Sequence, residues 1–468
     1  MLILIIQIFI LCDVIMGQCS VPQCTCLNGY VDCSGRKLTN VPSFPTNMVF
    51  YSTYQTLDLS NNNLTVLRNG DFNQAPFKKI LLRNNHIRSI DAHGFHGAAN
   101  TLIELDLSNN ELHYLPVALS ELESIKKLDV SGNPIEYGHN FNESVMKSIG
   151  DTILEFSFGG SSLSSWPRSL KHFPLLQSLT LDGTSDRLTI VPPDGFHGFT
   201  TTILKLNIRN TKLIGVPLGI SRLRNLRELH FDNNPYVGDR GILVQSFPTG
   251  AASNLHTMSL NGDNLTKLPV VLRYLPSLRN LSMDNNPLHF INDNEFGELR
   301  TINYLSMKNC SFPRIPAALS DFTFLQELDL SYNHIATIDE NDLEDLRFLE
   351  HLTISNNEVK YISQDAFGRV PRLKSVNFTN TNLTSVPRGI GRVWPCMEDV
   401  HVENNPIDCM CETLVWLRDY RDQCRIDGYP VQIHGKCDTI YDDIEHYIQV
   451  FIPHCPEYKE IHGIPPYN

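Results

Sequence analysis

Apolar residues between Leu57 and Ile407 recur in one pattern, L-x-L-x-x-N-x-L, with polar residues between them. Fifteen copies, 23 to 29 residues apart, begin at residues 57, 80, 105, 128, 156, 179, 206, 229, 258, 281, 305, 328, 352, 376 and 400. The first two apolar positions lie two residues apart, so they point to the same side of a short strand. One such strand cannot bury its apolar face, whereas a stack of parallel strands can. The pattern therefore predicts an α/β-type solenoid with one parallel, concave β-sheet.

The sixth position of the pattern is expected to turn the chain inward after each strand. A buried turn leaves amide groups that need partners, and asparagine both donates and accepts hydrogen bonds. Nine copies have asparagine there, namely Asn62, Asn85, Asn110, Asn133, Asn234, Asn286, Asn333, Asn357 and Asn405. The other six have Ser161, Thr184, Thr211, Asp263, Cys310 and Thr381. We predict that this position is buried throughout the array.

The convex side is predicted to be mostly loop and short helix. Some repeats continue to a proline, as at Pro116, Pro217, Pro269 and Pro387. Others have a phenylalanine or its substitute Leu343, and these residues are Phe72, Phe95, Phe196, Phe296 and Phe367. We expect the phenylalanines to stack as a second apolar spine. Two of the longer repeats place extra residues at 136–153 and 237–255, which are expected to be surface loops.

The two ends of the chain differ from the array. Residues 2–11 form an apolar run that is too short to span a bilayer and is typical of a signal peptide, with Gly17 as the expected cleavage point. The end of the chain has neither a stop-transfer helix nor the tail of a lipid-anchor signal. We predict a signal peptide at 1–17, an N-terminal cap at 18–56, repeats at 57–407, a C-terminal cap at 408–456 and a polar tail at 457–468. The mature protein is expected to be secreted into the extracellular space or matrix.

The cysteines lie mainly at the two ends of the array. Four of the 12 precede it, at Cys19, Cys24, Cys26 and Cys33, and five lie near or beyond its end, at Cys409, Cys411, Cys424, Cys437 and Cys455. A solenoid exposes its core at both ends, and small caps rely on disulfides because they have little core of their own. The spacing C-x-C is unusual for structural zinc. The pattern favours two disulfide-bonded caps.

The cap motifs resemble those of extracellular leucine-rich repeat proteins, the group that includes Slit, the Nogo receptor and the variable lymphocyte receptors. The resemblance rests on C-x4-C-x-C-x6-C followed by V-P in front, and on N-P-x-x-C-x-C with W-L at residues 405–417. It implies a leucine-rich repeat horseshoe with the pairs Cys19–Cys26, Cys24–Cys33, Cys409–Cys437 and Cys411–Cys455. Cys310 is expected to be a buried free thiol, and a fifth bridge between Cys396 and Cys424 is a hypothesis.

Net charge and sequons narrow the class of partner. The formal charge of −13 argues against a nucleic-acid partner, because such a surface repels phosphate backbones. Seven sequons fit an exported glycoprotein, at Asn63, Asn142, Asn264, Asn280, Asn309, Asn377 and Asn382. Glycans at the later sites would shield the C-terminal part of the concave face, which leaves the region before Asn264 for a ligand.

The sequence has no nucleophile with its base, no metal cluster and no phosphate loop of convincing spacing. The nearest candidates are His230 with Asp232 and His401 with Glu403, each pair projecting from one strand face. The first pair has poor ligands beside it, at Asn207, Arg209, Ser259 and Asn261. We therefore expect no catalytic residue, no cofactor and no metal.

The exposed face of the strands is the predicted working surface. Acidic residues cluster near its centre at Asp182, Asp232 and Asp284, interrupted by Arg209, and these four form the predicted ligand patch. Aspartates of the L-D-L-S phrase, at Asp58, Asp106, Asp129 and Asp329, are interpreted as structural. A purely solvated face is the competing interpretation of the central acids.

The sequence favours a secreted, non-enzymatic scaffold that binds an extracellular protein. One alternative is an acidic structural glycoprotein of an extracellular or mineralised matrix, and another is a protein inhibitor of an extracellular enzyme. Fold alone does not choose among them, and the oligomeric state is left open.

Overall fold

The computed structural model describes residues 19–45, 50, 53–73, 75–250, 253–292, 295–296, 299–393 and 395–455. The predicted signal peptide and polar tail lie outside these residues. Two compact units divide the chain, and we describe each by itself. Unit 1 comprises Met1–Tyr236 and Gln245–Pro248, and unit 2 comprises Val237–Val244 and Thr249–Asn468.

The main sheet of unit 1 follows the predicted repeats. Its strands are β1 (Thr25–Leu27), β2 (Tyr30–Asp32), β3 (Thr56–Asp58), β5 (Lys79–Leu81), β7 (Glu104–Asp106), β8 (Lys127–Asp129), β9 (Glu155–Phe158), β10 (Ser178–Asp182), β11 (Lys205–Arg209) and β12 (Glu228–Asp232). β1 and β2 are antiparallel, and every later pairing in this unit is parallel. A parallel pair, β4 (Val66–Leu67) with β6 (Ser89–Ile90), lies outside this sheet.

Unit 2 repeats this arrangement with strands in parallel register. Its main strands are β13 (Thr257–Ser259), β14 (Asn280–Ser282), β15 (Tyr304–Ser306), β16 (Glu327–Asp329), β18 (His351–Thr353), β20 (Ser375–Asn377), β21 (Asp399–His401) and β22 (Gln432–His434). A second parallel pair joins β17 (Thr337–Ile338) to β19 (Tyr361–Ile362). The last strand, β22, belongs to the C-terminal cap rather than to a repeat.

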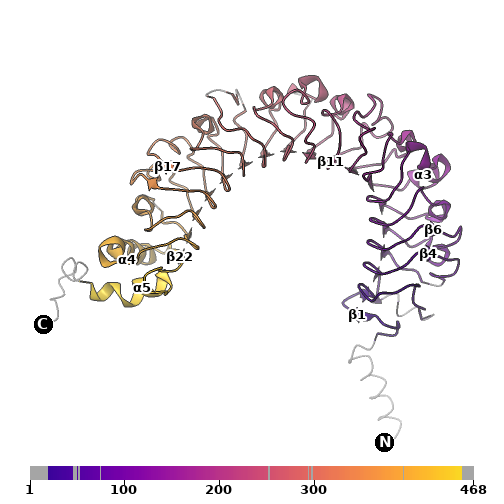
Figure 1. The fold of residues 1–468 in the computed structure, drawn as a ribbon, viewed down its shortest axis with the longest axis horizontal. Helices are drawn as coiled ribbons and strands as arrows, with labels where there is room; N and C mark the ends of the chain where they lie inside the picture. The colour runs from indigo at the N-terminus through magenta and orange to yellow at the C-terminus, as the bar shows by residue number, and fades with distance from the viewer. Residues whose placement is uncertain are drawn as a thin grey trace, which may run out of the picture. The chain divides into compact units, whose positions relative to one another are not determined.

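Short helices lie on the opposite side of each unit from the strands (Figure 1). The 3₁₀ helices are η1 (His96–Ala98), η2 (Val117–Glu121), η3 (Gly138–Asn140), η4 (Arg168–His172), η5 (Leu218–Arg222), η6 (Val244–Ser246), η8 (Val270–Tyr274), η9 (Ala317–Asp321), η10 (Arg388–Arg392) and η11 (Ile452–His454). Proline is the N-cap residue of six of them, η2, η4, η5, η8, η9 and η10, because its fixed φ prepares the helical turn. The predicted proline turns are therefore 3₁₀ helices.

Three α-helices complete the described elements, α3 (Glu143–Gly150), α4 (Cys411–Ile426) and α5 (Ile444–Val450). α3 lies within the first insertion, which was expected to be a surface loop. Its N-cap residue Asn142 accepts hydrogen bonds from Ser144, and the helix buries Val145, Met146 and Ile149. The extra residues therefore add a packed helix to unit 1.

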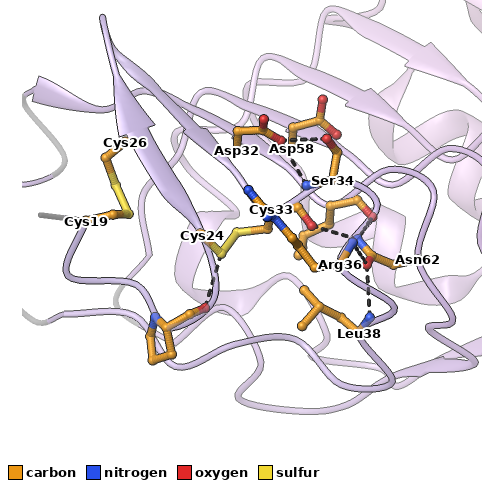
Figure 2. Close-up of a disulfide and its surroundings, with 12 residues drawn as sticks. Cys19, Cys24, Cys26, Asp32, Cys33, Ser34, Arg36, Leu38, Asp58 and Asn62 are labelled. Carbon is orange, nitrogen blue, oxygen red and sulfur yellow. Dashed lines mark hydrogen bonds between the residues drawn. A yellow bond between two sulfur atoms is a disulfide. The ribbon is translucent and has the colours of Figure 1, made fainter. Parts of the chain in front are cut away.

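The asparagines of the repeat pattern form hydrogen bonds to the neighbouring turn of the chain, as Asn62 shows at the first repeat (Figure 2). Its Nδ2 donates to the carbonyl oxygens of Cys33 and Leu59, both at 2.9 Å. Its Oδ1 accepts from the backbone amides of Arg36 and Leu38, at 3.0 and 2.9 Å. The side chain thus replaces the partners that the buried turn lacks.

Ser161 is the exception to the prediction that this position is buried, because its side chain is exposed. Two glycines precede it, and both have positive φ, 119° at Gly159 and 152° at Gly160. A Cβ on Gly160 would lie 2.8 Å from the carbonyl oxygen of Asn133. In this repeat the backbone itself fills the inward turn, so the following serine faces solvent.

The phenylalanine spine forms in parts. Phe72 stacks on Phe95 with ring centroids 5.7 Å apart, and Phe44 extends the stack toward the N-terminal cap. Phe196 instead packs edge-on against Trp166, and Phe296 packs against Phe322 with the two rings tilted by 57°. All five predicted phenylalanines are buried, as is Leu343.

Disulfides secure both ends of the array. The bridges Cys19–Cys26 and Cys24–Cys33 lie within the N-terminal cap, around the hairpin of β1 and β2 (Figure 2). Behind the array the bridges are Cys396–Cys424, Cys409–Cys437 and Cys411–Cys455. These include every pair that the family resemblance implied and the hypothetical fifth bridge. Cys310 is the free cysteine of the described residues, and it is buried.

Candidate binding surface

The open face of β10, β11 and β12 presents a regular set of polar side chains in unit 1. Asp182, Arg209 and Asp232 occupy the same register position on these neighbouring strands. On each of these strands, the apolar residues that alternate with the polar ones are buried, because successive side chains of a strand point to opposite faces. Three of the four predicted patch residues therefore lie in one row.

Arg209 binds Asp182 directly. Its Nε and Nη2 lie 3.0 and 2.9 Å from Oδ2 of Asp182, and Asn210 donates to Oδ1 of the same carboxylate at 2.7 Å. Part of the predicted negative charge is consequently neutralised within the row. The surface is a fixed array of alternating charge rather than a purely acidic patch.

Asp284 lies in unit 2 and has a different environment. Its Oδ1 accepts a hydrogen bond from the Ser306 hydroxyl at 2.6 Å and from the Lys308 amide at 2.8 Å. The carboxylate joins its own repeat to the next one. This residue therefore has a structural function besides any contact with a ligand.

Aspartates at the second position of the pattern accept hydrogen bonds from the backbone amide two residues later. Oδ1 of Asp106 accepts from the amide and hydroxyl of Ser108, at 2.9 and 2.6 Å. Equivalent bonds join Asp129 to Ser131 and Asp329 to Ser331. Asp58 accepts from the amide of Ser60. The geometry agrees with the structural interpretation of the L-D-L-S phrase.

Lysine and glutamate side chains at the first residues of neighbouring strands form ion pairs in unit 1. Lys79 pairs with Glu104 at 3.0 Å, and Lys127 reaches both Glu104 and Glu155, at 3.7 and 3.5 Å. Lys205 and Glu228 pair at 2.9 Å on β11 and β12. Much of the formal charge on this face is thus balanced locally.

Exposed apolar side chains follow the strand turns at one edge of unit 1, a feature that sequence reasoning missed. They are Tyr114, Tyr137, Ile190, Ile214 and Tyr236, with exposed fractions of 37% to 62%. Lys212 lies over the Tyr236 ring at 5.1 Å, and the Ile214 amide donates to Thr189, beside Ile190. The signal was present in the sequence as apolar residues shortly after the sixth position of several copies.

The two histidine pairs considered from sequence differ in the structure. His230 Nε2 lies 3.7 Å from Oε2 of Glu228, on the same strand. His401 Nδ1 lies 3.1 Å from Oε1 of Glu403, as expected for neighbouring positions on one face. Asp399 and His434 join His401, with ligand atoms all within 4.8 Å of one another. Sequence reasoning missed His434 because it lies in the cap, outside the repeat register.

A second cluster of the same kind lies in unit 1, formed by His93, His96 and Glu121. His93 and His96 are exposed, and the side chain of His93 contacts Oε1 of Glu121 at 2.5 Å. Its histidines lie around a turn and η1 rather than on paired strands.

Cys310 occupies the asparagine position of its repeat and imitates asparagine in part. Its thiol lies 3.3 Å from the Met283 carbonyl, and its amide donates to Oδ1 of Asn333. Burial raises the pKa of this thiol to about 12, so the side chain stays protonated at neutral pH. A buried, protonated thiol is a poor nucleophile.

The seven sequons divide unequally between the units. Asn63 and Asn142 lie in unit 1, whereas Asn264, Asn280, Asn309, Asn377 and Asn382 lie in unit 2. Asn280 is an exposed residue of β14, and Asn377 lies half-buried in β20. The row on β10 to β12 has no sequon.

The repeats, the parallel strands and the terminal disulfides define a leucine-rich repeat protein with a cysteine-rich cap at each end. Family models agree with this class. Residues 77–135 match the leucine rich repeat model, and residues 271–389 match a BspA type leucine rich repeat region of six copies. None of the helices in the described part of the chain has the length and apolar character of a membrane span.

Individual relatives share the repeat architecture. The human leucine-rich repeats and immunoglobulin-like domains protein 3 is 28% identical over 47% of this chain, which spans 17% of that relative. Tsukushi from Gallus gallus is 28% identical over 55% of this chain and 68% of its own length. A solved leucine-rich repeat protein from Leptospira interrogans, 21% identical, has a TM-score of 0.58 and is covered over 94% of its chain and 86% of this one. This match shows that the two proteins have a similar fold.

Proposed function

We propose that the chain is an exported, non-enzymatic scaffold that binds an extracellular protein through the open strand face of unit 1. The observation that carries the proposal is the row Asp182, Arg209 and Asp232, which lies at one register position on three hydrogen-bonded strands. Side chains on paired strands keep a fixed spacing, so a partner meets a prepared surface with little loss of conformational entropy.

The exposed tyrosine and isoleucine side chains at the edge of unit 1 supply apolar contact area, which the polar row lacks. Tyrosines are enriched among residues that dominate binding energy, and the polar row contains no aromatic residue. Tyr236 follows β12 by four residues, and Ile214 follows β11 by five. A partner that covers the row and this edge would bury charged and apolar groups together.

Glycan placement supports the choice of unit 1. Five sequons lie in unit 2, and Asn280 and Asn377 belong to strands there. Glycans at these positions would cover part of the unit 2 strand face. The proposed row has no such shield.

A glycan introduced on the row tests the proposal. Arg209→Thr creates the sequon N-I-T at Asn207, in the middle of β11. The tagged chain, produced through a secretory pathway, is used to capture proteins from native extracellular extract at physiological salt. The wild type should retain proteins that bind the row. The glycosylated variant should retain at least tenfold less of the same proteins.

Arg209→Ala is the matched control, because it also removes the guanidinium but creates no sequon. A glycosidase-sensitive mobility shift shows that the new glycan is present. Charge reversal by Asp182→Arg with Asp232→Arg gives an independent disruption. Equal retention by all variants would contradict binding through this face, and retention of nothing by the wild type would favour a structural matrix protein.

A further inference from the structure

The clearest chemical site outside the proposed binding row lies where the last repeat meets the C-terminal cap. β21 and β22 pair in parallel, so that His401 lies opposite His434 and Asp399 opposite Gln432. Val400 and Ile433 are buried between them, which places Asp399, His401 and His434 together on the open face. A histidine from the cap and two residues from the last repeat therefore share one face.

The two imidazole rings lie almost parallel, with centroids 4.4 Å apart and an interplanar angle of 12°. Nε2 of His434 lies 3.1 Å from Oδ1 of Asp399. One nitrogen or oxygen from each of the three residues lies within 4.8 Å of the others. Ligand atoms of one zinc ion lie at most about 4.2 Å apart, so small rotations of these side chains would bring the three atoms around a single ion.

Glu403 orients one of these ligands. Its Oε1 lies 3.1 Å from Nδ1 of His401, and its Oε2 accepts a hydrogen bond from the Thr379 hydroxyl at 3.1 Å. A histidine that donates Nδ1–H to a carboxylate presents the lone pair of Nε2, which is the usual arrangement of a metal-binding histidine. Glu403 is therefore a positioning residue.

The supporting backbone is held by several bonds. The Val402 amide donates to the His434 carbonyl, and the Gln432 amide donates to the Glu398 carbonyl, both at 2.8 Å. The bridges Cys409–Cys437 and Cys411–Cys455 fix the cap around β22. Ligands on paired strands with fixed backbones keep their geometry better than ligands on loops.

We propose that Asp399, His401 and His434 form a zinc-binding site that joins the cap strand β22 to the last repeat strand β21. Two imidazoles with one carboxylate form a ligand set that zinc favours, with a fourth position open to solvent or to another group. Calcium and magnesium prefer oxygen ligands alone. Binding would stabilise the cap, because the ion contacts residues of both elements.

Calorimetric titration of the chelator-treated full chain with ZnCl2 tests the site. The wild type should bind zinc at this site, and His401→Asn and His434→Asn should each weaken that binding at least a hundredfold. Glu403→Gln should weaken it about tenfold or more, because loss of a supporting hydrogen bond lowers metal affinity to that degree. CaCl2 should produce no comparable binding.

His93→Asn is the matched control, because it removes a histidine from the cluster with His96 and Glu121. It should leave the binding at Asp399, His401 and His434 unchanged. Equal zinc affinity of the wild type, His401→Asn and His434→Asn would overturn the proposal, as would loss of all binding in His93→Asn alone.

A spectroscopic measurement keeps the test decisive if either histidine variant misfolds by circular dichroism. Co²⁺ added to the wild type should give visible absorption bands of a low-symmetry nitrogen and oxygen site, and ZnCl2 should remove them. Those bands should persist in His93→Asn and weaken in Glu403→Gln. Absence of the bands in the wild type would also overturn the proposal.

Discussion

Two sets of polar side chains on different strands of unit 1 have different roles. Asp106 and Asn110 on and after β7 bind backbone groups of their own and adjacent turns. Asp182 and Arg209 on β10 and β11 bind each other across the open face. The difference shows that residue type alone does not decide whether a side chain stabilises the fold or remains available to a partner.

The largest expected effect distinguishes the inward turn from its exposed exception. Asn110→Ala removes the acceptor of the Ile87 amide and a donor to the carbonyls of Leu82 and Leu107. Because each buried group left without a partner costs about 1–3 kcal/mol, we expect about 3 kcal/mol or more of destabilisation, measured as a lower urea midpoint.

Ser161→Ala provides the matched comparison at the same pattern position. Its side chain is exposed, so the change should stay within about 0.5 kcal/mol, as is usual for surface substitutions. Similar losses in Asn110→Ala and Ser161→Ala would show that burial does not explain the difference between these turns.

A smaller effect separates the two kinds of aspartate. Asp106→Ala removes an acceptor for two hydrogen bonds from Ser108 and should cost about 1–2 kcal/mol, measured by urea unfolding. Asp182→Ala breaks an ion pair with an exposed arginine, so it should cost less than about 1 kcal/mol. The assignment of roles fails if Asp182→Ala is the more destabilising substitution.

The smallest effect concerns the charge of Asp129. Burial raises the pKa of this carboxyl despite the hydrogen bonds from Ser131. A raised folded-state pKa contributes stability that is complete below the unfolded value and is lost as pH rises through the folded value. Asp129→Asn keeps the acceptor and removes the charge, so its Tm relative to wild type should rise between pH 3 and pH 7.

Asn377 shows that asparagine can take the place of aspartate at this pattern position. It occupies the same pattern position in β20, and its Oδ1 accepts from the Thr379 amide at 2.9 Å. The control is Asp106→Asn, because Asp106 occupies the same pattern position and accepts the equivalent hydrogen bonds from Ser108. A relative Tm of Asp129→Asn that falls with rising pH would contradict the assigned sign.

Sequence regularity predicted most of the fold because the same physical requirement recurs in every repeat. The alternation of leucines defined the buried face of strands such as β3, β7 and β16, and Asn62 illustrates the predicted turn chemistry. The exception at Ser161 depends on how the Gly159–Gly160 backbone passes close to Asn133 and Asp182, which the pattern alone does not specify.

By itself, the sequence determined the repeat period, the strand faces, the inward asparagines and the cysteine-rich ends, because each follows from local spacing. Only the tertiary structure decided which polar groups meet across repeats. Asp284 reaches Ser306 and Lys308, and His434 reaches Asp399 from a cap strand 35 residues away. Such contacts depend on which strands become neighbours and on the local path of the backbone, and both are set when the chain packs.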